Sequence, residues 1–249
     1  MKLCHFVFFL ACLILFFISC NKENAPDLIK STGEKITATR YLNGYHSITS
    51  FDHIDIEIKQ GNEYKAEIMG GKNLIPKIVL EVKDSMLTVK NRNTANWVRD
   101  YRKDDIKITL YVPTLKRIEQ FGSGIIYCKD TLKSDDLGID MQSSGDFDLV
   151  VDCRRFVCVQ YRRNYGNIKV RGRCTQLINV NDGTGQFNSL GLICQYARVE
   201  TINKGESYAH VPGPLAVKIV DSGNIYISGN PNPIQWLGKT GNGSLLLLQ

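Results

Sequence analysis

The alternation of hydrophobic and polar residues predicts β-strands along most of the chain. Residues 53–59 read HIDIEIK and residues 105–112 read DIKITLYV, and both alternate without a fault. Successive side chains of a strand point to opposite faces, so this pattern is typical of strands with one buried face. Further strands are expected at residues 64–69, 78–82 and 86–90, with turns at 60–62 and 83–85. No useful helical period follows residue 20, so we predict an all-β protein.

Seven glycines in the second half of the chain recur at intervals of 18 to 21 residues. Each lies in a short polar turn between two alternating apolar segments. A unit of about 20 residues cannot bury its own apolar face, so the period predicts coils that stack into a β-solenoid. Glycine is needed there either for a positive φ or because the next coil comes too close for a side chain. The seven are Gly124, Gly145, Gly166, Gly185, Gly205, Gly223 and Gly243.

The fold expected from these patterns is a single-stranded parallel β-helix over residues 115–249, preceded by a less regular β-rich part over residues 35–114. The apolar residues that flank each glycine are expected to point inward. Examples are Val157 and Val159 with Ile168 and Val170, and Val217 and Ile219 with Ile225 and Ile227. The polar residues that directly follow five glycines are expected to form a ladder that satisfies backbone groups of the turns: Asp146, Asn167, Gln186, Glu206 and Asn224.

The N-terminus predicts export. Residues 1–19 contain Lys2, a short apolar run and a small residue, which is the pattern of a signal peptide rather than of a membrane span. Residues 17–20, FISC, resemble the lipobox of bacterial lipoproteins, in which Cys20 is lipidated and becomes the mature N-terminus. An ordinary signal peptide with an incidental cysteine is the alternative. Residues 20–34 then form a polar tether.

Five cysteines remain after the signal and Cys20 are set aside. No Cys-x-x-Cys pair or nearby histidine accompanies them, so we expect no metal site and no cofactor. Three of them lie eight or nine residues after a repeat glycine, which places them at equivalent positions on neighbouring coils. A buried ladder of free thiols is favoured, and a disulfide stays open. The five are Cys128, Cys153, Cys158, Cys174 and Cys194.

The order of motifs resembles the Bacteroidetes family of exported head GIN domains of auto-transporter adhesins, over about residues 40–249. The resemblance implies a right-handed parallel β-helix and an adhesive or binding role, and it supplies no catalytic residue. The motifs that carry it are FDHID at 51–55, QGN at 60–62, FGSG at 121–124, SSGD at 143–146, DSGN at 221–224 and GNGS at 241–244.

Basic and aromatic residues replace the small residues of this pattern in the middle repeats. Such side chains on a regular stack suit anionic glycans or lipid headgroups. The alternative is a solvated face balanced by aspartates on neighbouring coils. The candidate binding residues are Arg162, Arg163, Tyr165, Lys169, Arg171 and Arg173, and Trp97 and Tyr101 in the polar loop between 91 and 104 add a second candidate.

Binding without turnover is the function we expect for an outer-membrane lipoprotein on either face of that membrane. The net charge of +6 is modest and mixed, so nucleic acid is not an expected partner. Expected partners are the membrane through the lipid, cell-surface, dietary or host glycans, and envelope proteins. A polysaccharide lyase or hydrolase is one alternative, although no paired carboxylates or catalytic triad stand out. A structural scaffold that oligomerises through the solenoid ends is the other.

Overall fold

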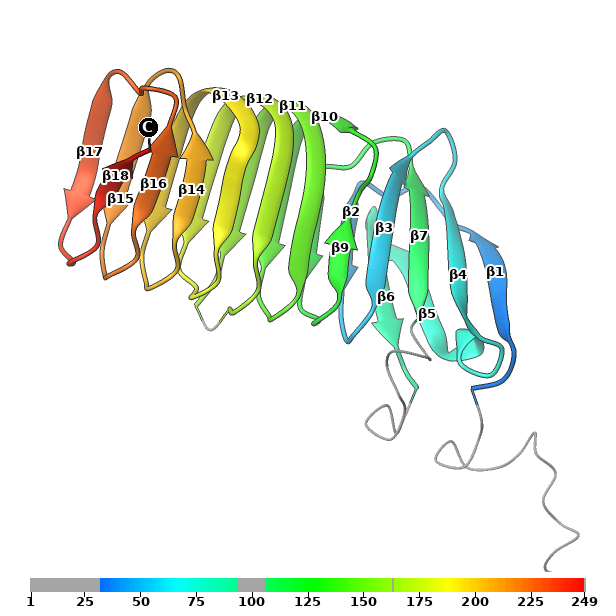
Figure 1. Cartoon of the computed structure of the whole chain (residues 1–249). Coiled ribbons are helices and arrows are strands. Elements are labelled where there is room, and N and C mark those ends of the chain that lie inside the picture. The colour runs from blue at the N-terminus through cyan, green and yellow to red at the C-terminus, as the bar shows by residue number, and fades with distance from the viewer. Residues whose placement is uncertain (1–31, 94–105, 163, 249) are drawn as a thin grey trace, which may run out of the picture.

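A computed structural model of the chain describes residues 32–93, 106–162 and 164–248, and Figure 1 shows their arrangement. The fold is all-β, with one short 3₁₀ turn, η1 (Ile75–Lys77), among these residues. Within the same residues no helix has the length and hydrophobicity that a membrane crossing requires. Cys20, Trp97, Tyr101 and Arg163 lie outside the described residues.

The second half of the chain forms the expected solenoid of stacked parallel strands (Figure 1). Each long strand bends over one rim, so its first half joins one sheet face and its second half joins the other. Register pairs such as Phe147↔Ile168 and Ile168↔Phe187 set the coils about 20 residues apart. The strands are β8 (Arg117–Gln120), β9 (Ile125–Tyr127), β10 (Leu132–Met141), β11 (Asp146–Gln160), β12 (Ile168–Asn181), β13 (Phe187–Thr201), β14 (Ser207–His210), β15 (Leu215–Ile219), β16 (Ile225–Ser228), β17 (Ile234–Lys239) and β18 (Leu245–Leu247).

The first half of the chain adds two coils to the same stack, in an order that does not follow the chain. The β2–β3 pair lies next to the β8–β9 pair, and the β6–β7 pair lies on its other side. The parallel stack therefore extends across residue 115 into the irregular part. The strands are β1 (Lys35–Tyr41), β2 (Ser47–Ser50), β3 (Asp55–Gln60), β4 (Lys65–Gly71), β5 (Ile78–Lys83), β6 (Met86–Asn91) and β7 (Lys107–Val112).

Antiparallel strands close this N-terminal end. β4 pairs with β7 and β1, and β5 pairs with β6. Leu74 and Ile75, at the start of η1, are buried in the end of the core. The last inward-facing side chains at this end are therefore covered.

Apolar side chains from both faces fill the core, and Phe147, Phe156 and Phe187 are among the largest that are fully buried. The inward orientation predicted for Val157 and Val159 is wrong. At the bend of β11 two consecutive residues, Arg154 and Arg155, are both exposed, and this shifts the alternation by one residue. A shift of one residue sends each following side chain to the opposite face of a strand. Phe156, Cys158 and Gln160 therefore face the core.

Close contact between coils is the reason for the repeat glycines. A Cβ on Gly185 would lie 1.8 Å from the carbonyl oxygen of Gly166, and one on Gly223 would lie 2.3 Å from that of Gly205. None of the seven has a positive φ. The polar ladder is confirmed at three of its five positions, because Asp146, Asn167 and Asn224 each accept from a backbone N–H of the next coil, at 2.7, 3.1 and 2.8 Å. Glu206 instead accepts from the hydroxyl groups of Tyr208 and Tyr226.

The cysteines form the expected buried ladder. Cys153 lies in register with Cys174, which lies in register with Cys194. These three, Cys128 and Cys158 are all buried and free. Burial raises the pKa of Cys128 and Cys194 to about 11 and that of Cys153 to about 12.

Candidate binding cleft

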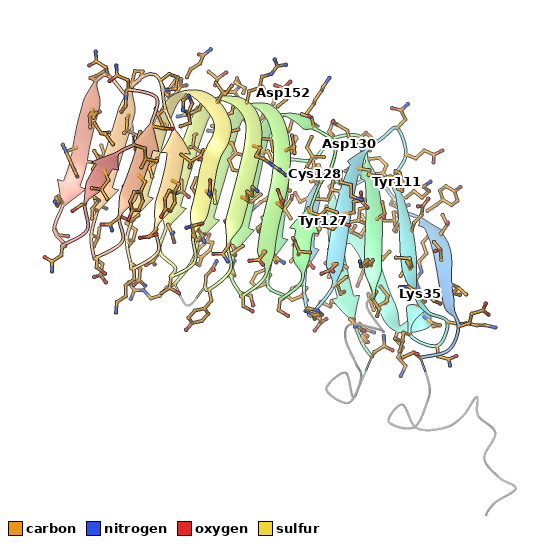
Figure 2. All side chains as sticks on the ribbon, viewed as in Figure 1. Lys35, Tyr111, Tyr127, Cys128, Asp130 and Asp152 are labelled. Atoms are coloured by element: carbon orange, nitrogen blue, oxygen red, sulfur yellow. The ribbon has the colours of Figure 1, made fainter. Side chains whose placement is uncertain are left out.

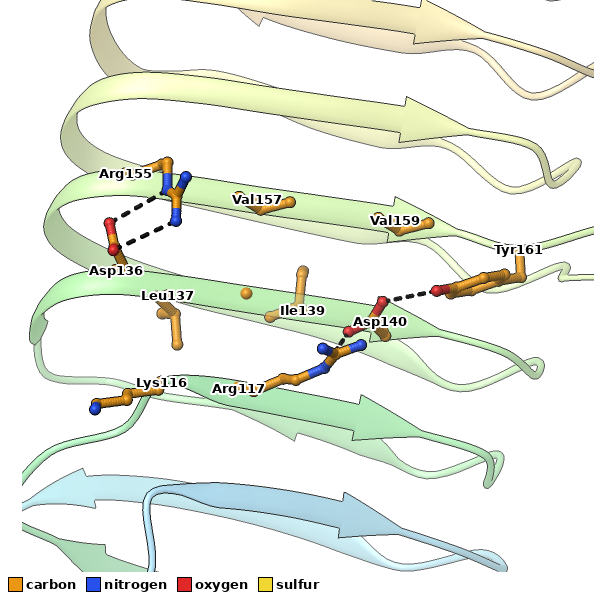
Figure 3. A pocket seen from close by; sticks show the side chains of 11 residues that line it. Lys116, Arg117, Asp136, Leu137, Ile139, Asp140, Arg155, Val157, Val159 and Tyr161 are labelled. Atoms are coloured by element: carbon orange, nitrogen blue, oxygen red, sulfur yellow. Dashed lines mark hydrogen bonds and ion pairs between the residues drawn. The ribbon is translucent and has the colours of Figure 1, made fainter. Parts of the chain in front are cut away.

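A cleft of about 360 Å³ lies on the outer face formed by β8, β10 and the second half of β11, and Figure 3 shows it from close by. The outward-facing column in this place runs from Arg117 through Gly138 to Val157. Gly138 has no side chain, and a Cβ there would meet nothing nearer than 3.8 Å. The missing side chain leaves the hollow between Arg117 and Val157.

One wall of the cleft is apolar. Val157 and Val159 point outward from β11 into it (Figure 3). Their partners in the next coil, Ile178 and Val180, are also only partly buried. These four β-branched side chains thus form an apolar strip on the outer face, and each of them is partly exposed to solvent.

Fixed polar groups occupy one end of the cleft. Arg117 Nε lies 2.8 Å from a carboxylate oxygen of Asp140, and the Tyr161 hydroxyl donates to the other oxygen at 3.2 Å. Arg117 also contacts Glu119 at 3.0 Å. Asp140 is only 5 % exposed, so its outward position does not leave it in solvent. Burial raises the pKa of Asp140 above its ordinary value, although Arg117 opposes the shift.

The other end of the cleft is basic. Arg155 pairs with Asp136 at 3.3 Å, while Lys116 has no side-chain partner in the part of the chain that the structure describes. A ligand that enters the cleft therefore meets an apolar wall between a buried carboxylate and an unpaired ammonium group.

A second hollow of about 520 Å³ lies on the opposite face, and we name it the basic hollow. Lys129 lies 5.9 Å from the ring centroid of Tyr127, and Arg171 pairs with Asp148 at 2.6 Å. Figure 2 marks its position through Tyr127 and Cys128. Its lining residues are Asp55, Lys107, Ile125, Tyr127, Cys128, Lys129, Asp148 and Arg171.

The structure does not gather the basic residues predicted from the middle repeats into one patch. Arg162 and the exposed Tyr165 lie at the turn between β11 and β12, whereas Lys169 and Arg171 lie on the outer face of β12. Arg173 lies near the bent rim, beside Asp152 (Figure 2).

Aspartates on neighbouring coils balance most of these charges. Arg162 pairs with Asp182 at 3.6 Å and Arg173 with Asp152 at 2.6 Å. Together with the Arg171–Asp148 pair, this arrangement matches the solvated alternative. Among the described residues Lys169 has no ion pair, and the uncharged Tyr165 is exposed.

The sequence pattern alone does not single out Lys116, Arg117, Asp140 and Tyr161 as a site. One signal was available. Gly138 is a glycine within an alternating strand, away from the 20-residue period, and such a position marks a place where a side chain is missing from the sheet surface.

The profile described as "Putative auto-transporter adhesin, head GIN domain" matches residues 44–231. The chain belongs to the head GIN domain family. The match begins just before β2 and ends after β16, so it includes the whole cleft and the basic hollow. Among curated proteins, none matches this chain.

Solved structures of similar proteins share the fold of this head GIN domain. A putative adhesin from Bacteroides fragilis is 21% identical, with a TM-score of 0.74 over 86% of this chain and 97% of its own. A putative adhesin from Parabacteroides distasonis is 17% identical, with a TM-score of 0.64 over 87% and 98%. A protein from the same species, titled as a putative lipid binding protein, is 18% identical, with a TM-score of 0.63 over 87% and 98%.

Proposed function

We propose that this protein is an exported, lipid-anchored cell-envelope protein that binds a saccharide in the cleft without turning it over. Membership of an adhesin-like family supports a role at the envelope or cell surface. The signal-like N-terminus and the lipobox-like residues 17–20 support export and anchoring. The cleft supports the choice of ligand.

A sugar ring has apolar C–H faces and a rim of hydroxyl groups. The strip of Val157 and Val159 offers a surface for a C–H face, and the end of the cleft offers acceptors and donors for hydroxyl groups. Ligand sites commonly combine apolar walls with a few placed polar groups in this way. Lys116 can in addition hold an acidic substituent of the saccharide.

The observation that carries this proposal is the arrangement around Asp140. Arg117 and Tyr161 hold its carboxylate from two sides before any ligand is bound (Figure 3). Because the polar groups are already ordered, a ligand loses less free energy in fixing them. A hydroxyl group that donates to this carboxylate would make a charge-assisted hydrogen bond.

A glycan array probed with the full chain tests the proposal. We expect binding to a defined set of saccharides, and we expect Gly138→Val to abolish it because the new side chain fills the cleft. The matched control is Arg171→Ala, which alters the basic hollow and leaves the cleft intact. Equal binding by the wild-type chain and Gly138→Val would contradict the proposed site, and loss only in Arg171→Ala would move it to the basic hollow.

Incubation of the bound saccharide with the protein tests the absence of turnover. We expect no new reducing or unsaturated ends. Release of such ends, abolished by Asp140→Asn, would replace binding with catalysis, because a carboxyl group of raised pKa in a cleft can serve as a general acid.

Metabolic labelling with a fatty-acid analogue tests the anchor. We expect label on the wild-type chain and on Cys12→Ala, whose substitution lies inside the signal, and no label on Cys20→Ala. Equal labelling of the wild-type chain and Cys20→Ala would contradict lipidation at this residue.

A further inference from the structure

Another hollow lies on the same outer face as the cleft, farther along the stack. It measures about 420 Å³, and we name it the Ala216 hollow. Ala216 lies in register with Arg198 in the preceding coil and with Gln235 in the next one. A residue smaller than both of its neighbours therefore makes this hollow, as Gly138 makes the cleft.

The cleft and the Ala216 hollow lie on one column of outward-facing residues. Register pairs connect the column coil by coil, and none of its members is buried. Neighbouring strands are about 4.8 Å apart, so the four coil steps from Gly138 to Ala216 cover roughly 19 Å. Part of the apolar strip lies between the two hollows. In chain order the column is Arg117, Gly138, Val157, Ile178, Arg198, Ala216 and Gln235.

Each hollow has the same kind of ion pair beside it. Arg117 pairs with Asp140 at the cleft, and Arg198 pairs with Glu200 at the Ala216 hollow. Asp140 is 5 % and Glu200 is 4 % exposed, whereas about half of each arginine side chain is exposed. The terminal nitrogens of Arg198 have no partner in the described part of the chain. A guanidinium group that is held in this way suits a carboxylate of a ligand.

An unpaired ammonium group accompanies each ion pair. Lys116 lines the cleft, and Lys218 lies in register with Glu200 in the next coil. Neither lysine has an ion pair within the described ranges. The rim of the Ala216 hollow is apolar, because Tyr196 and two prolines line it. Tyr196 is exposed, so its ring offers a surface for the C–H face of a sugar.

We propose that the cleft and the Ala216 hollow are the two ends of one binding face for a linear acidic oligosaccharide. This inference rests on the proposed function and extends it from one ring to a chain that runs along the stack. A short saccharide reaches one hollow, whereas a longer chain reaches both and lies over Val157 and Ile178. Its carboxylates pair with Lys116 at one end and with Arg198 at the other. Engagement of two hollows by one ligand raises its affinity.

Calorimetric titration with acidic oligosaccharides of increasing length tests this inference. The probes are the galacturonate, mannuronate and hyaluronate series, from dimers to octamers. In at least one series we expect octamers to bind at least about tenfold more tightly than dimers. The gain is expected as a step at the length that first spans both hollows, because additional binding registers alone raise affinity only in proportion to length.

Two variants assign the step to the Ala216 hollow. In Ala216→Glu the new carboxylate fills the hollow beside Arg198, so octamers are expected to bind no more tightly than dimers. Tyr196→Ala removes an exposed side chain and is expected to reduce the step even if Ala216→Glu misfolds. The matched control is Leu246→Glu, which adds the same charge on the opposite face, in register with the outward-facing Tyr226. We expect this control to keep the step.

Equal affinities for dimers and octamers in every series would overturn the inference, and so would a step that both variants retain. If Gly138→Val still abolishes the binding of short saccharides in that case, the proposed function stands and only the extended face is wrong. Binding of neutral saccharides alone would likewise leave the cleft and overturn the acidic ligand. Absence of binding to any saccharide would contradict both proposals.

Discussion

Gly166 lies so close to Gly145 in the preceding coil that a Cβ on Gly166 would lie 1.8 Å from the carbonyl oxygen of Gly145 and 2.9 Å from Sδ of Met141. Gly145 has the same relation to Gly124, at 2.5 Å. Each turn of the solenoid thus rests on the backbone of the turn before it, and a side chain at this position would push two coils apart.

We expect Gly166→Ala to lower the free energy of unfolding by at least about 3 kcal/mol, because neither the Gly145 carbonyl nor Met141 can withdraw without breaking the stack. Chemical denaturation measures the change. The matched control is Gly138→Ala, where the new Cβ has open space. Its change is expected to stay within about 0.5 kcal/mol. Similar losses in both variants would contradict the close-contact explanation.

The polar ladder gives a smaller, local effect. Asn167 accepts from the backbone N–H of Gln186 at 3.1 Å, so Asn167→Ala is expected to cost about 1 kcal/mol of stability. Gln142→Ala, at an exposed turn position whose side chain makes no contact of this kind in the described structure, serves as the control. A loss in the control as large as that in Asn167→Ala would indicate a general loss of turn structure.

The carboxyl group of Asp140 is expected to make stability depend on pH. Burial raises its pKa in the folded state, so the protonated form is favoured on folding. Its contribution is therefore greatest below the ordinary pKa of an aspartate and is lost as the pH rises through the raised value. Asp140→Asn is expected to remove this part of the pH dependence in denaturation experiments.

Asp152 provides a control of opposite sign. Its hydrogen bond from Arg173 lowers its pKa, so its contribution is present above the ordinary value and is lost as the pH falls through the lowered one. Asp152→Asn is expected to lower stability near neutral pH and to leave it unchanged in strong acid. Identical pH profiles for the two variants would contradict these assignments.

The cysteine ladder is expected to be chemically inert in the folded protein. Burial raises the pKa of all five thiols, so little thiolate exists at neutral pH to react with an alkylating reagent. Mass spectrometry after brief treatment should find these cysteines unmodified, and it should find all five modified in denaturant. Rapid labelling of Cys153 in the native chain would contradict its burial.

The repeated part of the fold could be predicted from the sequence because each coil repeats one local rule. The glycine period reports the contact between coils, and the alternation reports which face is buried. The rule fails where its phase changes. At Arg154 and Arg155 the strand bends and two consecutive residues face solvent. The next four residues, 156–159, are all apolar, so the alternation does not show which of them face the core. The inward orientation that the alternation predicts for Val157 and Val159 is therefore wrong.

The order of the first coils and the cleft depend on contacts between distant segments. β6 and β7 stack on β2 and β3, although the chain visits β4 and β5 between them, and a period search detects only neighbours in sequence. The cleft likewise combines Arg117, Gly138 and Tyr161 from three successive coils. Single residues of these types are common on any sheet surface, so only the register brings them together as a site.

A crystal structure of the protein with a saccharide selected on the array would test the central claim most directly. The account predicts a sugar ring against Val157 and Val159, with a hydroxyl group bonded to the carboxylate of Asp140 between Arg117 and Tyr161. A saccharide found in the basic hollow or at the turns of the solenoid, with the cleft filled by water, would contradict it.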